Sequence, residues 1–360
     1  MESVMAKGSL YSVSDKAMFD AINQSKVTNN DLKSLFLSRG ILISAQTKRK
    51  NLATYFSMFP HTYTDYKTLA DILGTNSRKE KNTSTRLDVS VDKEIIETTA
   101  AQLISELEYY GVDCSLDMDE KNGSLNINVI YEEFDYSSSE FKQVIKKSAS
   151  IVVELDESEV VIRHPQNKTV EEWKASFISK LEVELEKEIL PQNISLSHVT
   201  EHSKVTSFFE SLIDDLEGYN LEDVTDVYVY HPKGLEGDFD NDTGNDDIDL
   251  GTHISKASLK GQNVLKSKEL QQLYDKGFYI SKIVWRSKKG KAVDADIYEF
   301  EAQFSDAETR EQFSYLAKGF YSYKEAGGGY AKSRKGISSI QERELNQLIE
   351  RSASNILSNI

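Results

Sequence analysis

The chain has 360 residues, enough for two or three domains of about 150 residues each, and its 43 Lys and Arg against 59 Asp and Glu give a net charge of −16. Such an acidic total normally excludes nucleic-acid binding, but residues 1–82 carry 12 basic and 7 acidic side chains, residues 83–250 carry 13 and 39, and residues 251–360 carry 18 and 13. The three net charges are therefore +5, −26 and +5, so the exclusion applies only to the middle.

The sequence also limits the compartment. No stretch reaches the roughly 18 uninterrupted apolar residues of a transmembrane helix, and charged residues interrupt the first 21 positions, which argues against a signal peptide. The single Cys114 excludes an intramolecular disulfide framework and fits a reducing compartment. We expect a cytoplasmic protein without membrane contact.

Residues 1–74 have the pattern of a small helical domain. Apolar residues recur at helical spacing in segments 15–26, 28–39, 47–59 and 65–73, and Gly40 and Pro60 end two of these helices. The polar, charged run that follows has no periodicity, which predicts a linker at 75–85.

Part of this domain resembles the SAP, or helix-extension-helix, DNA-binding motif. The similarity covers residues 28–59, about a tenth of the chain, and is carried by Asp31-Leu32-Lys33, Arg39-Gly40, Lys48-Arg49-Lys50 and Leu52. The resemblance implies that the basic residues at the start of the second helix contact phosphates, the role that Lys48 and Arg49 would take with Lys50 beside them. A helix N-terminus with adjacent cations favours phosphate on physical grounds as well. The alternative is an ordinary helical hairpin with a solvated basic run.

Alternating patterns then predict an α+β fold class. Residues 86–165 give the order βαββαβ of a ferredoxin-like sandwich: strand 86–91, helix 93–110, strands 112–118 and 125–131 around the turn Asn122-Gly123, helix 138–147 and strand 150–155. Residues 166–250 form an acidic α/β segment with helix 169–190, strand 194–199, helix 204–216 and strand 224–230.

The same order is predicted again in residues 252–360. Strand 253–259, helix 267–276, strands 278–286 and 294–304, helix 306–317 and strand 320–323 form a second ferredoxin-like copy, followed by a C-terminal helix over 339–356. The fold expected is therefore a small helical domain followed by repeated ferredoxin-like domains.

The basic residues of the tail form a second candidate nucleic-acid site. Arg286, Lys288 and Lys289 fill a predicted turn between two strands. Lys332, Arg334 and Lys335 follow shortly after several aromatic residues, namely Phe320, Tyr321, Tyr323 and Tyr330. Cations can hold a phosphate backbone while rings stack on bases. The alternative is a solvated hairpin turn.

An Asp-rich loop at 235–251 is a candidate metal site. Asp238, Asp240, Asp242, Asp246 and Asp249 occupy positions 1, 3, 5, 9 and 12 of a calcium loop. Thr243 replaces the usual glycine at position 6, so a flexible acidic loop is the favoured alternative. We expect no cofactor, with calcium or magnesium at this loop as the alternative.

Common enzyme motifs are absent from the sequence, so we expect a protein that is not an enzyme. The preferred hypothesis is a DNA-binding or adaptor protein. It contacts phosphates through the basic head (residues 1–74) and the basic tail (residues 252–360), and it binds a protein partner through the acidic middle segment (residues 166–250). The first alternative is an acidic protein-interaction or DNA-mimic component of a bacterial or phage complex, for example in antiviral defence. The second is a metal-dependent nuclease built on Asp294, Asp296, Glu299 and Glu301.

Overall fold

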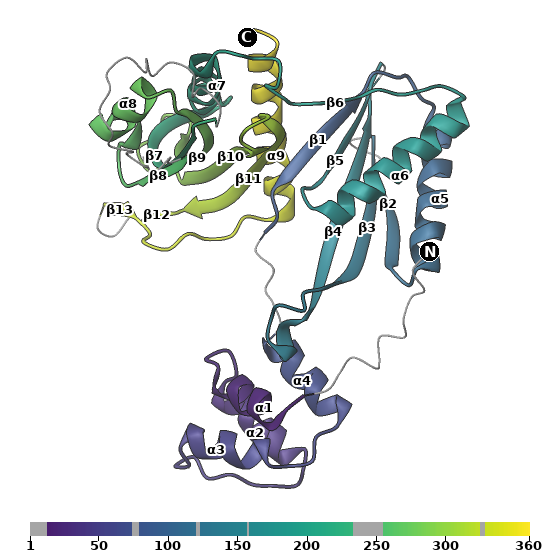
Figure 1. The fold of residues 1–360 in the computed structure, drawn as a ribbon, viewed down its shortest axis with the longest axis vertical. Coiled ribbons are helices and arrows are strands. Elements are labelled where there is room, and N and C mark those ends of the chain that lie inside the picture. Colours follow the sequence, from purple (N-terminus) through teal and green to yellow (C-terminus); the bar gives the residue numbers. More distant parts are fainter. Residues whose placement is uncertain (1–12, 74–78, 120–122, 157, 233–254, 325–327) are drawn as a thin grey trace, which may run out of the picture. The chain divides into compact units, whose positions relative to one another are not determined.

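The computed structural model describes residues 13–73, 79–119, 123–156, 158–232, 255–324 and 328–360 (Figure 1). The chain divides into two compact units. Unit 1 contains residues 1–79, 98–117 and 126–150, and unit 2 contains residues 80–97, 118–125 and 151–360. Among the helices of the described residues, none is long and apolar enough to cross a bilayer.

Unit 1 contains the four helices that periodicity predicts near the N-terminus: α1 (Asp15–Asn23), α2 (Asn29–Leu37), α3 (Arg49–Ser57) and α4 (Tyr63–Leu73). Thr28 and Asp31 form a capping box that starts α2, and Gly40, with φ of +73°, follows its last turn. The core of these helices includes Met18, Leu32, Phe36 and Phe56. It is completed by Phe141, from the short 3-10 helix η2 (Glu140–Lys142). The head is therefore a helical unit with its own core.

Helix α5 (Lys93–Tyr109) and strands β2 (Asp113–Asp119), β3 (Ser124–Phe134) and β4 (Val144–Leu155) have residues in both units. The remaining elements belong to unit 2: β1 (Asn82–Leu87), β5 (Val160–Pro165), α6 (Lys168–Leu185), β6 (Pro191–Asn193), α7 (His202–Asp214), β7 (Tyr219–Tyr230), β8 (Lys256–Lys260), η3 (Val264–Lys266), α8 (Lys268–Asp275), β9 (Tyr279–Lys289), β10 (Ile297–Asp306), β11 (Glu311–Tyr321), β12 (Tyr323–Lys324), β13 (Gly329–Tyr330) and α9 (Ser339–Leu357).

A large antiparallel sheet dominates the β structure, so the fold is α+β. Its hydrogen-bonded order is β2-β3-β4-β5-β1-β11-β10-β9-β7-β8, with β6 pairing to β1 and a separate two-stranded ladder of β12 and β13. Antiparallel register joins β9 to β10 and β10 to β11, so these three strands form a meander.

The ferredoxin-like repeats are not confirmed. The helix predicted at 138–147 is replaced by η2 and the start of β4, and the helix predicted at 306–317 is a turn followed by β11. The strand predicted at 194–199 is also wrong, because the strand of this region, β6, ends at Asn193. Pairing with β10, whose register places Asp306 opposite Glu311, makes residues 311–317 extended instead of helical.

The strands β7 to β11 bury one face against helices. Helix α7 packs against β9 and α9 against β11, and Trp285, Phe300 and Tyr315 from three adjacent strands are fully buried in the shared core (Figure 1). Successive residues of a strand point to opposite faces. The residues between these core positions therefore lie on the other face, which carries the charged side chains described next.

Candidate nucleic-acid interface

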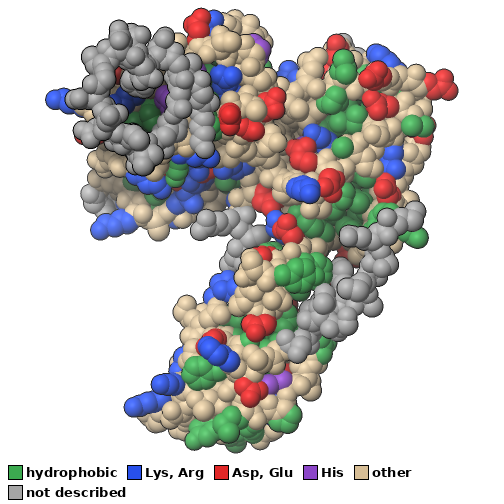
Figure 2. Space-filling model, viewed as in Figure 1, with side chains coloured by type: hydrophobic (Ala, Val, Ile, Leu, Met, Phe, Trp, Pro, Cys, Tyr) green, Lys and Arg blue, Asp and Glu red, His purple; other side chains and the backbone are tan. Residues whose placement is uncertain are grey.

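The face of β7–β11 opposite α7 and α9 carries a concentration of cations, which we call the basic face. On β9, Lys282, Arg286 and Lys288 alternate with the core residues Ile283 and Trp285. The other cations of the basic face are Lys81, Lys260, Lys318 and Arg334. Figure 2 shows Lys and Arg side chains gathered over the part of unit 2 that holds β8 to β12. The strand alternation therefore sorts apolar side chains into the core and cations onto the basic face.

A buried carboxylate lies at the centre of the basic face. The side chain of Glu301 is 7% exposed, and its oxygens lie 2.7 Å from Lys282 Nζ, 2.9 Å from Lys81 Nζ and 3.0 Å from Lys318 Nζ. Burial alone would raise the pKa of Glu301, but hydrogen bonds from Lys282 and Lys81 outweigh it and bring the pKa to about 2. Glu301 is thus a carboxylate that holds three ammonium groups.

Glu299 forms a second buried carboxylate two residues earlier on the same face. It accepts hydrogen bonds from Arg286 Nε at 3.1 Å and from the Tyr321 hydroxyl at 2.8 Å, and it pairs with Arg334. Lys318 Nζ, 3.8 Å away, bridges the two carboxylates. Burial would raise the pKa of Glu299, but these partners lower it below its ordinary value.

The cations of this cluster outnumber its carboxylates. Five cationic side chains contact Glu299 and Glu301, so the cluster of these described residues has a surplus of three positive charges. The pKa of Lys81 is lowered mainly by burial, and the nearby Lys282 and Lys318 lower it further. Cations that repel one another in a partly desolvated cluster gain from an added anion. The arrangement is chemically suited to binding phosphate.

Aromatic rings lie between the cations. Lys282 Nζ is 4.8 Å from the centroid of the Tyr228 ring, and Lys260 Nζ lies 5.6 Å from the same centroid. The Arg286 guanidinium carbon is 4.5 Å from the centroid of Tyr321. Lys288 Nζ is likewise 5.4 Å from the centroid of Tyr330. Cation–π contacts hold the long side chains in place while leaving their charges at the surface.

A glycine allows the chain to cross the basic face. Gly319 has φ of +144°, and a Cβ there would lie 2.2 Å from the carbonyl oxygen of Lys335. Phe320, the next residue, exchanges backbone hydrogen bonds of 2.8 and 3.0 Å with Lys335. Only glycine permits this approach, which places Arg334 beside Glu299.

The structure places three of the six predicted tail cations, Arg286, Lys288 and Arg334, on the basic face. Arg286, Lys288 and Lys289 belong to β9 and not to a turn, so that part of the prediction was wrong. Arg334 joins Arg286 at Glu299, while Lys289, Lys332 and Lys335 are exposed. The cations of the basic face that the sequence does not single out are Lys81, Lys260 and Lys282. The alternation of Lys282, Arg286 and Lys288 with apolar residues was the available signal.

The basic residues of the head have different environments. Lys48 and Lys50 are exposed at the start of α3. The Arg49 guanidinium donates hydrogen bonds to the carbonyl oxygens of Ile22 at 2.6 Å and Gln24 at 2.7 Å, and to that of Val27. Arg49 therefore ties α3 to the end of α1, and the exposed cations of this run are its two neighbours.

The predicted metal sites receive no support. Asp238, Asp240, Asp242, Asp246 and Asp249 lie outside the described residues. Within the described ranges, no group of three or more His, Cys, Asp or Glu side chains could hold a metal ion. Glu299 and Glu301, considered for a nuclease, are surrounded by cations that would repel a divalent metal.

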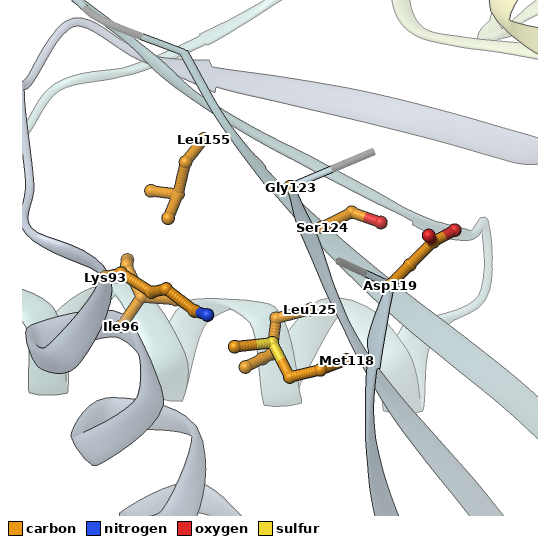
Figure 3. Close-up of a pocket in the computed structure, with 8 residues that line it drawn as sticks. All are labelled: Lys93, Ile96, Met118, Asp119, Gly123, Ser124, Leu125 and Leu155. Carbon is orange, nitrogen blue, oxygen red and sulfur yellow. The ribbon is translucent and has the colours of Figure 1, made fainter. Parts of the chain in front are cut away.

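A mostly apolar pocket of 380 Å³ lies elsewhere in unit 2 (Figure 3). Its apolar lining comes from α5, the adjoining ends of β2 and β3, and β4, as Ile96, Met118, Leu125 and Leu155. Lys93 extends toward Met118 and Leu125 in Figure 3, and Asp119 pairs with Arg343 at 3.2 Å. None of the residues that line this pocket belongs to the basic face.

A comparison of the chain with protein-family models finds no match, and a search of curated proteins finds no similar sequence.

Proposed function

We propose that the protein is a nucleic-acid-binding protein, with DNA as the expected partner, that contacts phosphates through the basic face. The observation that carries the proposal is the set of five cations held around two buried carboxylates. Because Glu299 and Glu301 restrain their partners, less side-chain freedom is lost when a phosphate binds.

The extent of the basic face favours a polymer over a small anion. Its cations are distributed over β11, β9 and β8, with β10 and β7 between. Neighbouring strands are about 4.8 Å apart, so these five strands span about 19 Å. A nucleic-acid strand carries one charge per about 3.4 Å, so this width can face five or six phosphates. The rings of Tyr228 and Tyr321 between the cations add sites where bases could stack.

The head contributes a second basic surface to the proposal. Lys48 and Lys50 are exposed at the N-terminal end of α3, where backbone N–H groups favour an anion. The SAP-like resemblance of this region supports the same role. In this proposal Arg49 stabilises the head and its two neighbours contact phosphates.

The decisive experiment is fluorescence anisotropy with a labelled DNA duplex and with one of its strands, between about 50 and 200 mM salt. The test variant carries Lys260→Gln, Lys288→Gln and Arg334→Gln, three cations of the basic face. The control carries the same charge change at exposed residues elsewhere in unit 2, as Lys168→Gln, Lys266→Gln and Lys268→Gln.

The test variant should weaken binding much more than the control. Each lost phosphate contact lowers the slope of log K against log salt by about 0.9 for duplex and about 0.7 for a single strand. No measurable binding at about 50 mM salt would overturn the proposal and favour the alternative in which the acidic segment binds a protein. Equal effects of the two variants would exclude the basic face. A separate Lys48→Glu, Lys50→Glu variant measures the contribution of the head.

A further inference from the structure

A second, chemically different cavity lies in unit 2, between β1, α6 and the start of β11. Its volume is 520 Å³, within the usual range for small-molecule sites. Every residue that lines it is polar or charged: Thr83, Glu171, Lys174, Asn193, Ser195, Ser197, Glu311 and Gln312. The absence of any hydrophobic residue among those that line this cavity argues against a lipid or a flat aromatic ligand.

An ordered chain of polar contacts runs along one wall of the cavity. Lys174 Nζ lies 2.6 Å from a Glu171 carboxylate oxygen and 3.4 Å from Thr85 Oγ1. The Thr85 hydroxyl in turn donates to Asn193 Oδ1 at 2.7 Å. The Lys174 side chain is only 12% exposed, so its ammonium is fixed in position at the cavity. These contacts place a donor, an acceptor and an amide within one small space.

A buried histidine lies directly behind this wall. His164 is 1% exposed and is the register partner of Thr83 on β1, so both side chains lie on the same face of the sheet. Its Nδ1 is 3.1 Å from the Pro165 carbonyl oxygen, and its Nε2 has no hydrogen-bond partner among the described residues. The nearest carboxylate oxygen to Nε2 belongs to Glu171, at 3.6 Å.

Burial lowers the pKa of His164 and favours the neutral ring. The His164 side chain is fully buried and does not line the cavity, whereas the Glu171 carboxylate next to it is 40% exposed and does. The groups that can face a ligand on this wall are therefore Glu171 and Lys174, and His164 lies behind them.

The backbone at the rim is strained as well. Gln312, which lines the cavity, has φ of +56°, and Arg310 has φ of +58°. Non-glycine residues rarely adopt this conformation, and those that do concentrate at functional sites. The Gln312 carbonyl accepts a hydrogen bond from Gln166 Nε2 at 3.1 Å, which helps to hold this conformation.

We propose that this cavity binds a small polyhydroxylated molecule of monosaccharide size. A hydroxyl both donates and accepts, so one hydroxyl can donate to Glu171 while another accepts from Lys174. Thr83, Asn193 and the two serines offer further paired donors and acceptors. The proposal is independent of nucleic-acid binding, because the basic face shares no residue with the cavity.

The test is saturation-transfer NMR with the full chain and a panel of ribose, glucose and inositol, with adenosine and spermidine as comparison ligands. At least one polyol should give saturation transfer, and isothermal titration should give its affinity. Lys174→Met and Asn193→Ala should each lower that affinity at least tenfold. Lys168→Met, on the exposed side of the same helix, should leave it unchanged.

A conservative variant and a spectroscopic signal distinguish the loss of a ligand contact from misfolding of the protein. Thr83→Val keeps the side-chain shape and removes one hydroxyl, so it should also weaken binding in a folded protein. The ligand should shift the imidazole ¹⁵N signal of His164, assigned among the six histidines with His164→Gln. The proposal is overturned if no polyol binds, if only spermidine or adenosine binds, or if affinity survives in both Lys174→Met and Thr83→Val.

Discussion

Glu301→Gln tests whether the carboxylates of the basic face stabilise the fold. The carboxylate of Glu301 is 7% exposed and held by Lys81, Lys282 and Lys318, and its pKa is about 2 against an ordinary value of 4.5. A pKa lowered by about 2.5, at about 1.4 kcal/mol for each pKa unit, corresponds to about 3 kcal/mol of stability. Glutamine mimics the protonated group in size but has no charge, so the variant should lose about this amount at pH 7.

The effect must depend on pH in a defined direction. A carboxyl group whose pKa is lower in the folded state stabilises the fold above its unfolded pKa and loses that contribution as the pH falls through the folded pKa. The difference between the wild-type chain and Glu301→Gln should therefore be about 3 kcal/mol at pH 7, about 1.5 kcal/mol at pH 3, and close to zero below pH 2.

Urea unfolding of both proteins, followed by the fluorescence of the buried Trp285, measures this difference. Glu308→Gln serves as a control, because this carboxylate lies in the turn between β10 and β11 and outside the basic face. A difference below about 0.5 kcal/mol at pH 7, or one that does not change between pH 7 and pH 3, would refute the reasoning.

Three further substitutions test separate contacts. Gly319→Ala should free the segment around Arg334 and speed tryptic cleavage there, because a Cβ would meet the Lys335 carbonyl oxygen; Gly336→Ala, with open space around it, should not. Arg49→Met should lower the thermal stability of the head by about 2–4 kcal/mol and Lys50→Met should not, because only Arg49 donates to carbonyl oxygens at the end of α1. Glu350→Ala, which removes the buried partner of Arg163, should cost about 3–5 kcal/mol in urea unfolding; Glu344→Ala, exposed on the same helix, should cost little.

The head could be predicted from sequence because its signals are local. The capping box of Thr28 and Asp31 and the apolar stripe of Leu32, Leu35 and Phe36 need no knowledge of the rest of the chain. Local patterns were insufficient for residues 306–317, which are predicted as a helix. There, hydrogen bonding to the distant residues of β10 decides the structure.

The candidate site could be predicted only in part for the same reason. Arg286, Lys288 and Arg334 stand out as basic residues near aromatic ones, but Lys81 lies over 200 residues before its partner Glu301. Nor does a basic run at a helix start show that the middle residue, Arg49, bonds to carbonyl oxygens at the end of another helix. Contacts between distant segments depend on the topology, and spacing along the sequence does not contain them.

The buried carboxylates also explain how an acidic chain can present a basic face. Without carboxylates beside them, five cationic side chains would repel one another and turn away from the sheet. With five carboxylates, the group would have no net charge to attract an anionic ligand. Glu299 and Glu301 neutralise only part of the positive charge and hold the long side chains in fixed positions. Part of the negative charge in the total of −16 therefore lies inside this cluster, and under the proposed function it holds the cations in position for a phosphate.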